Sequence, residues 1–129
     1  MTLDDYLSAA ARKPVVYGTF DCLLFLADWV LWQKGVDVAA RWRGKYACER
    51  EASRLMSHYG GMEALIDFAV KGVLTPAETP VAGDIAIVRP HGARELGGAI
   101  RTTTGFAVLK RHGGLWTAPH RLVAAWSFA

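Results

Sequence analysis

Residues 15–32 read VVYGTFDCLLFLADWVLW, and this stretch decides how the rest of the chain can fold. A short extended run meets Gly18, a polar Asp-Cys pair follows, and a long apolar segment then begins. The apolar residues of that segment cover nearly every side of a helix, which is typical of a buried helix. Gly35 is a good C-terminal breaker. The sequence therefore predicts a central buried helix over residues 21–34, with Cys22 in its first turn.

Other helices are predicted before and after this one, in the front half of the chain. Thr2 can cap a first helix, with Asp5 three residues on as the partner of a capping box. Two more helices are expected at residues 47–59 and 62–70, because each amphipathic or apolar run ends at glycine. Residues 75–83 (TPAETPVAG) then form a Pro-rich connection to the back half.

The back half carries the pattern of short strands, separated by Gly, Pro or Thr clusters. Connections this short favour antiparallel pairing, since parallel strands need long crossovers. The predicted fold class is α+β in a single domain, residues 1–129, with helices first and then a small antiparallel sheet or half-barrel. The expected strands are residues 84–89, 96–102, 105–111, 114–118 and 122–128.

The composition excludes several functional classes. The chain is 52% hydrophobic and 21% charged, as folded proteins are, and its net charge of +3 is spread without a dense basic block. We therefore expect no specific nucleic-acid partner. Two cysteines and four histidines show neither a disulfide framework nor metal-ligand spacing, so no metal or cofactor is expected. The N-terminus does not resemble a signal peptide, and the longest apolar run is far below the ~18 residues of a membrane span.

Two interpretations of Cys22 follow from its position. A thiol in the first turn of a helix feels unpaired N–H groups and the positive end of the dipole, which lower its pKa and favour the thiolate. The negative charge of Asp21 would partly oppose this effect. A buried cysteine can equally act as a small apolar residue. The spacing leaves both interpretations open.

Two segments resemble parts of a known enzyme family. YGTFDCLLFLADWV, residues 17–30, resembles the nucleophile segment of the NlpC-type cell-wall hydrolases, which are papain-like cysteine peptidases. PVAGDIAIV, residues 80–88, is similar to the turn that starts the first strand of their sheet. The order of the two segments also agrees. The resemblance implies a papain-like NlpC-type fold, in which a central helix carrying Cys22 at its N-terminus packs on a C-terminal antiparallel sheet.

The chain is also similar to a group of small proteins encoded among the tail genes of tailed phages and phage-derived particles. This similarity rests on residues 17–30, on RWRGKY at residues 41–46, and on the single-domain length. It implies a virion component of the tail tip that is made in the host cytoplasm. Its expected partners are other phage tail proteins.

The histidine that the NlpC resemblance implies is not at its expected place. In those enzymes the catalytic histidine opens the second strand after the GD turn. The corresponding stretch here is RELGGAIRT, residues 94–102, where Leu96, Gly97 or Gly98 stands at that position. A cysteine peptidase needs a base to accept the thiol proton, so the catalytic set is incomplete by the family's own pattern.

Two other histidines are candidates for the base. His91 lies in the loop before this strand, and His112 follows the next strand, although both positions also suit a plain surface turn. The residue that would orient the imidazole falls at Lys110, which cannot accept a hydrogen bond. The candidate catalytic residues are thus Cys22, His91 and His112.

Two functions remain as hypotheses. The first is a structural or assembly role at the tail tip, on a scaffold that has lost catalysis. The alternative is an active cysteine endopeptidase that cuts peptidoglycan peptides and aids genome entry, with backbone N–H groups at the helix start as the oxyanion hole.

The tryptophans provide a further expectation. Trp29 and Trp32 belong to the apolar helix and should lie in the core. Trp42, between two arginines, is the candidate for an exposed anchor in a contact surface.

Overall fold

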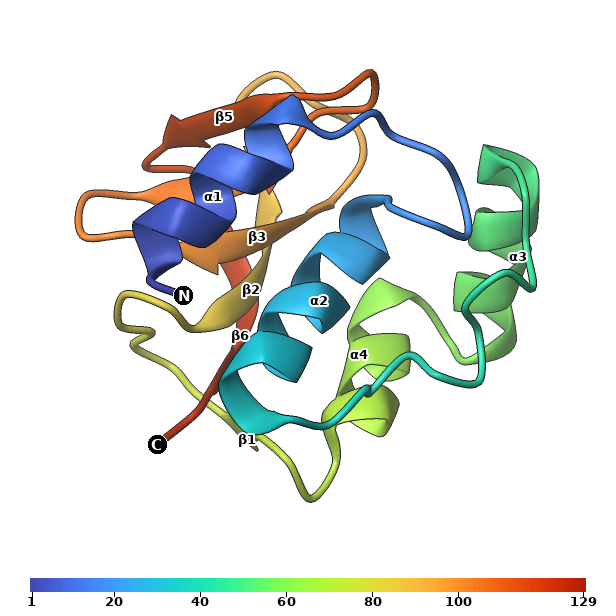
Figure 1. Cartoon of the computed structure of the whole chain (residues 1–129), viewed down its shortest axis with the longest axis horizontal. Coiled ribbons are helices and arrows are strands. Elements are labelled where there is room, and N and C mark those ends of the chain that lie inside the picture. The colour runs from blue at the N-terminus through green and yellow to red at the C-terminus, as the bar shows by residue number, and fades with distance from the viewer.

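The computed structural model describes residues 1–129 as four helices followed by one antiparallel sheet (Figure 1). This arrangement confirms the predicted α+β class. The helices are α1 (Leu3–Arg12), α2 (Cys22–Lys34), α3 (Glu49–His58) and α4 (Met62–Val70). The strands are β1 (Thr75–Pro76), β2 (Ile85–Arg89), β3 (Gly97–Arg101), β4 (Phe106–Leu109), β5 (Leu115–Ala118) and β6 (Arg121–Ser127).

The ends of α2 are fixed by the residues that predicted them. Asp21 is the N-cap, and its carboxylate accepts the backbone N–H groups of Leu23 and Leu24. Gly35 ends the helix in the left-handed conformation, at φ +70°. α1 likewise begins at the capping box of Thr2 and the residue three positions on.

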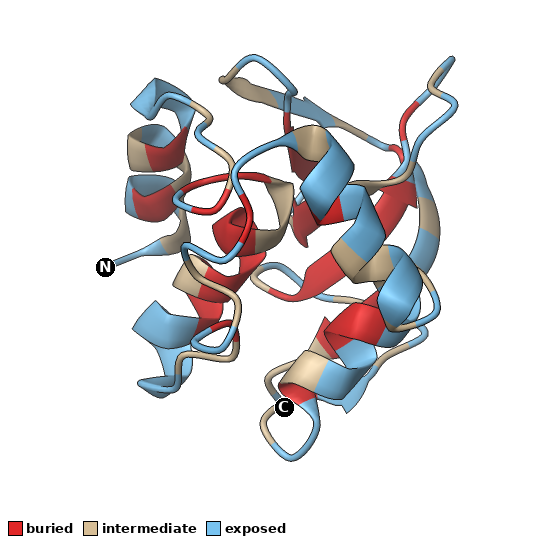
Figure 2. Ribbon diagram, turned by 90° about the vertical axis from the view of Figure 1, so that its right-hand side faces the viewer, coloured by how far each residue is buried: buried red, intermediate tan, exposed pale blue.

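The sheet has the strand order β1-β6-β2-β3-β4-β5, and every neighbouring pair is antiparallel. It curls into a half-barrel. Alternate side chains of β2, β3, β4 and β6 form a separate apolar cluster on the face turned away from α2. The opposite face contributes Ile85, Ile87 and Ile100 to the main core, which also contains residues of α1, α2 and α4. Figure 2 shows that the buried stretches of the helices and strands lie toward the middle of the molecule and the exposed stretches toward its outside. The chain thus brings the start of α2 against the sheet.

The tryptophans of α2 differ from each other. Trp29 is 4% exposed and donates its indole N–H to the carbonyl of Gly83 at 2.7 Å. Trp32 is 59% exposed, so the prediction that it lies in the core is wrong. The final turn of α2 extends beyond the elements that cover its beginning, and Leu31 beside it is also exposed.

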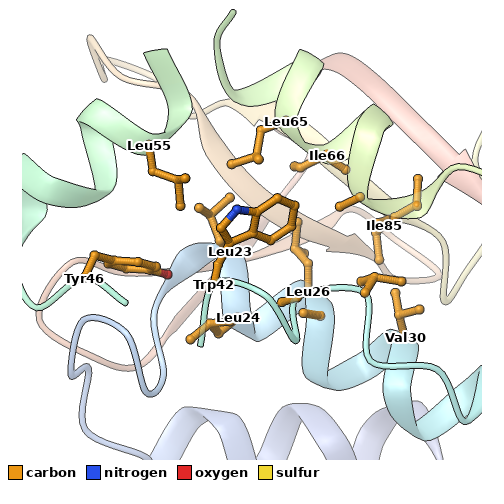
Figure 3. Close-up of a pocket in the computed structure, with 15 residues that line it drawn as sticks. Leu23, Leu24, Leu26, Val30, Trp42, Tyr46, Leu55, Leu65, Ile66 and Ile85 are labelled. Atoms are coloured by element: carbon orange, nitrogen blue, oxygen red, sulfur yellow. The ribbon is translucent and has the colours of Figure 1, made fainter. Parts of the chain in front are cut away.

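The prediction of an exposed Trp42 is also wrong. Trp42 is half-buried and lines an apolar cavity of about 40 Å³ between α2, α3 and α4 (Figure 3). Its indole lies edge-on to Tyr59, with ring centroids 5.5 Å apart. Leu23 and Leu55 approach the same cavity from α2 and α3. The aromatic side chain of this loop therefore packs inward.

No helix of the structure has the length and apolar character needed to cross a bilayer.

Candidate functional site

Cys22 lies at the junction of two surface grooves. One, the helix-side groove, runs along α3 and the start of α4, and the other, the sheet-side groove, runs along the loop before β3 and the β4–β5 hairpin. Both are lined by Tyr17, Cys22, Glu95 and Leu96. The helix-side groove continues over Glu49, Ala52, Ser53, Met56, Ser57, Gly61 and Met62; the sheet-side groove continues over Val15, Pro90, Ala93, Gly97, Val108, Leu109, Lys110, Arg111 and Trp116.

The surroundings of Cys22 keep its thiol protonated. Burial raises the pKa of this thiol to about 12, and the charges of Asp21 and Glu49 act in the same direction. The backbone N–H groups of Cys22 and Leu23 lower the pKa, as expected at a helix start, but their effect is smaller. The thiol is therefore neutral at physiological pH.

No histidine lines either groove at Cys22. His91 is exposed in the loop after β2, and His112 is exposed in the turn between β4 and β5. His120 is buried against Trp116, and His58 ends α3 at the surface. None of the four lines either groove. Neither candidate base, His91 or His112, thus shares a groove with Cys22.

The strand expected to carry the histidine does lie against Cys22. A Cβ atom built on Gly98 would stand 2.7 Å from the carbonyl oxygen of Cys22 and 3.1 Å from Cδ1 of Leu26. This close approach of two backbones requires glycine. Leu96, two residues earlier, lines both grooves beside Cys22. An apolar side chain and a glycine occupy the place where the base is expected.

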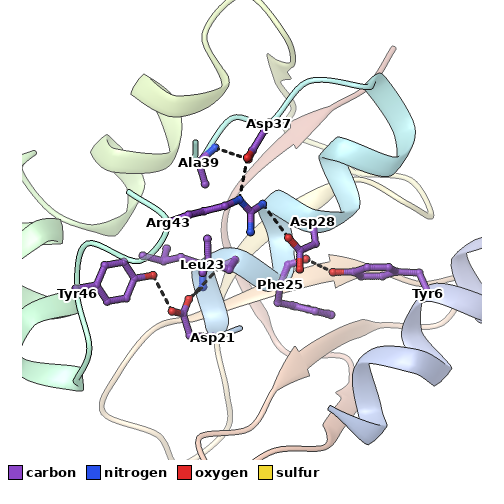
Figure 4. A network of polar contacts seen from close by, with 10 residues as sticks. Tyr6, Asp21, Leu23, Phe25, Asp28, Asp37, Ala39, Arg43 and Tyr46 are labelled. Atoms are coloured by element: carbon purple, nitrogen blue, oxygen red, sulfur yellow. Dashed lines mark hydrogen bonds and ion pairs between the residues drawn. The ribbon is translucent and has the colours of Figure 1, made fainter. Parts of the chain in front are cut away.

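Both carboxylate oxygens of Asp21 accept hydrogen bonds that hold the local structure together (Figure 4). Besides the two N–H groups at the start of α2, it accepts the N–H of Gly18 at 3.0 Å and the hydroxyl of Tyr46 at 2.7 Å. Gly18 in turn accepts the N–H of Gly44 at 2.9 Å. The Asp-Cys pair is thus tied to the RWRGKY segment.

A second pair of contacts fixes the same segment to the middle of α2. Arg43 lies 2.8 Å from Asp28 and 2.8 Å from Asp37, and Figure 4 shows its guanidinium between the two carboxylates. These contacts lower the pKa of Asp37, chiefly through its hydrogen bond with Arg43. The sequence patterns did not predict this network. The spacing of Asp21 and Asp28, two helical turns apart, places both on one face and was the available signal.

Three charged residues lie together on the walls of the two grooves at Cys22. Arg111, from the β4–β5 turn, forms an ion pair with Glu49 at the start of α3 and lies 3.8 Å from Glu95. Glu95 lines both grooves, while Arg111 lines the sheet-side groove and Glu49 the helix-side groove. The ion pair therefore joins the rims of the two grooves. No group of His, Cys, Asp and Glu side chains is arranged to hold a metal ion.

A family model described as a domain of unknown function (DUF6950) matches residues 1–128. No curated protein and no solved structure matches the chain. The family match covers almost the whole chain, and the protein therefore belongs to the DUF6950 family.

Proposed function

We propose that this protein is a non-catalytic component of the tail tip of a phage or phage-like particle, built on an NlpC-type scaffold. The observation that carries the proposal is the state of Cys22: a half-buried thiol at a helix start with a raised pKa, and no histidine in either adjoining groove. Its partners are other tail proteins.

The arrangement of elements supports the NlpC-type scaffold. Cys22 begins a helix that packs on an antiparallel sheet, and the first long strand follows Asp84, whose carboxylate accepts the N–H of Val81 at 2.9 Å within a tight turn. The next strand, β3, passes directly beside Cys22. Both features support the papain-like scaffold that we propose.

The chemistry of the site supports the loss of catalysis. A cysteine peptidase attacks with a thiolate and needs a base within hydrogen-bond reach. Because its pKa is raised to about 12, the thiol of Cys22 stays protonated at neutral pH. Leu96, which lines both grooves together with Cys22, can neither accept nor return a proton. The site has kept its shape without the groups that perform the reaction.

The residues behind the tail-protein resemblance have a structural explanation that fits this proposal. Tyr46 and Arg43 hold the 37–46 loop on α2 through Asp21 and Asp28. They act on the shape of the scaffold and not on the thiol chemistry. A protein selected for its shape in an assembly would keep them when catalysis is lost.

The experiment that tests the proposal uses the phage or particle whose genome encodes this chain. Mass spectrometry of purified particles should detect the protein, and deletion of its gene should stop tail assembly. A gene carrying Cys22→Ala should restore infectious particles to the wild-type titre, because no step needs the thiol. A Tyr46→Phe/Arg43→Met variant should restore fewer, because it loosens the scaffold.

Two results would contradict the proposal. Particles that lack the protein and assemble normally without it would exclude a structural role. The endopeptidase would instead be established by two findings together. The folded Cys22→Ala protein would fail to complement the deletion, and it would release no peptides from peptidoglycan whereas the wild-type protein would.

A further inference from the structure

A third groove opens at the mouth of the half-barrel, next to the sheet-side groove. This barrel-mouth groove is lined by the loop that follows β2 and by the segment that joins β5 to β6. It shares Pro90, Ala93 and Trp116 with the sheet-side groove. Its lining residues are Arg89, Pro90, His91, Gly92, Ala93, Trp116, Ala118, Pro119, His120 and Arg121. It thus combines two arginines and two histidines with no acidic residue.

The two arginines form an unfavourable pair. Arg89 of β2 is the direct cross-strand partner of Arg121 of β6, so both side chains leave the same face of the sheet. Neither forms an ion pair with an acidic side chain. Arg89 donates one N–H to the carbonyl of Arg94 at 2.8 Å, which leaves most donors of its guanidinium free. Like charges directly opposite each other destabilise a sheet unless an anion lies between them.

Rigid apolar groups stand beside these charges. The indole of Trp116 is 41% exposed and packs edge-on against the buried ring of His120, with centroids 4.5 Å apart. His120 is also held by a contact of 3.2 Å between Nε2 and the carbonyl oxygen of Trp116. Pro90 and Pro119 also line the barrel-mouth groove. The groove therefore needs little ordering to receive a ligand.

We propose that the barrel-mouth groove binds a short acidic peptide segment of a partner protein. The carboxylates would pair with Arg89 and Arg121, and a neighbouring apolar side chain would lie against Trp116. Arginine clusters recognise acidic motifs in this way, because each guanidinium presents a fork of donors that matches a carboxylate. Cys22 takes no part in the contact, so the groove can bind such a segment whether or not the protein belongs to a phage tail.

A peptide fits this groove better than a nucleic acid. Binding to a phosphate backbone needs a track of many cations, whereas the cations here form one cluster on a chain of net charge +3. The prolines and the tryptophan match a ligand in which carboxylates alternate with apolar side chains.

The test measures fluorescence anisotropy of a fluorescein-labelled octapeptide of alternating glutamate and leucine at about 0.15 M salt, where long-range attraction is screened. A matched octapeptide carries glutamine in place of glutamate. We expect the glutamate peptide to bind at least about tenfold more tightly than the glutamine peptide. The double variant Arg89→Gln/Arg121→Gln should lose at least about tenfold of that affinity.

The control is a second double variant with the same loss of charge, Arg12→Gln/Arg50→Gln, at exposed positions on α1 and α3. It should bind the glutamate peptide as the wild type does. Thermal melts separate binding from folding: removing the Arg89–Arg121 pair should leave the melting temperature equal or higher, because the repulsion is relieved.

Several results would overturn the proposal. One is no saturable binding of the glutamate peptide up to about 1 mM, which corresponds to only ~4 kcal/mol of binding free energy. Another is an equal loss of affinity in the two double variants, which would show a response to net charge alone. A twelve-residue oligo(dT) that binds more tightly than the peptide, with the same dependence on Arg89 and Arg121, would assign the groove to nucleic acid instead.

Discussion

Cys22 occupies the first position of α2, where two opposing effects act on its thiol. The N–H groups at the helix start favour the thiolate, whereas burial and the charge of Asp21 favour the neutral thiol. Burial has the largest effect, and the pKa rises to about 12. The place of the residue at a helix start is therefore insufficient to predict its reactivity.

This raised pKa predicts a loss of stability at alkaline pH. The unfolded thiol loses its proton near pH 8.5, but the folded one keeps it up to about pH 12. The folded state then binds more protons, so the unfolding free energy falls as the pH rises through this window, by up to ~1.4 kcal/mol per pH unit. Urea unfolding at about pH 8 and pH 10 should show this fall for the wild type to be about 2 kcal/mol larger than for Cys22→Ala.

The exposed Cys48 provides the control for this measurement. Cys48→Ala should keep the full alkaline loss of the wild type. If Cys22→Ala and the wild type lose stability in parallel, the pKa of the Cys22 thiol is not raised in the folded protein.

Gly18 is a second residue whose backbone position is decisive. It has φ +86°, and a Cβ atom there would lie 2.1 Å from the carbonyl oxygen of Tyr46. Gly35 also has a positive φ, of +70°, but a Cβ atom there would contact nothing within 4 Å. We expect Gly35→Ala to cost about 1 kcal/mol and Gly18→Ala about 3 kcal/mol or more, measured by denaturant unfolding. Equal costs would mean that the backbones of residues 18 and 46 are not in contact.

At the scale of elements, local signals predicted the bounds of the helices and of β2 to β6 to within a few residues, whereas β1 lies in the segment expected to be a Pro-rich connection. α2 ends where its cap and its glycine place it, because both signals act within one turn. The error at Trp32 has a different origin. An apolar helix surface indicates burial on average. Whether the last turn of such a helix is covered depends on where the other helices and the sheet lie. The sequence therefore predicted the helix but not its exposed end.

The two ion pairs of Arg43 predict that replacing this residue lowers the stability of the protein. Arg43→Met leaves Asp28 and Asp37, both half-buried, without their cationic partner. Charged hydrogen bonds of this kind contribute about 1.5–3 kcal/mol, so we expect the unfolding free energy to drop by about 2 kcal/mol. Lys45→Met, at an exposed position of the same loop, should change it by less than about 0.5 kcal/mol. Similar effects of the two variants would show that the loop is not held by these ion pairs.

The apolar cavity beside Trp42 predicts a stabilising substitution. Its free volume of about 40 Å³ corresponds to about 1 kcal/mol at ~24 cal/mol per Å³. Ala69→Val on α4 adds methyl groups at the cavity wall and should recover part of this free energy. Ala64→Val, on the exposed side of α4, carries the same helix-propensity change and is the reference. If Ala69→Val melts below Ala64→Val, the cavity has no room for the added methyl groups.

At the scale of the whole molecule, the α+β class and the order of elements were predictable, and so was the position of Cys22 at the start of the central helix. The grooves could not be predicted from the sequence. The barrel-mouth groove joins residues 89–93 to residues 116–121 through the curl of the sheet, and no local pattern encodes that curl. For the same reason the absence of His91 and His112 from the grooves at Cys22 could not be predicted, because both lie in turns whose direction depends on the tertiary structure.

The whole-molecule arrangement predicts that one substitution can change the state of the thiol. Leu96 lines both grooves at Cys22, so Leu96→His places an imidazole beside the sulfur, which can stabilise the thiolate as an ion pair. In a Cys48→Ala background, alkylation of Cys22 by iodoacetamide at neutral pH should accelerate at least about tenfold. Leu96→Gln, of similar size but without a titrating group, should react as slowly as the parent. Gly98→His should fail to fold, because its Cβ atom would stand 2.7 Å from the carbonyl oxygen of Cys22. If Leu96→His folds yet reacts no faster than Leu96→Gln, the segment that enters β3 does not bring residue 96 to Cys22, and the papain-like arrangement proposed for the scaffold is wrong.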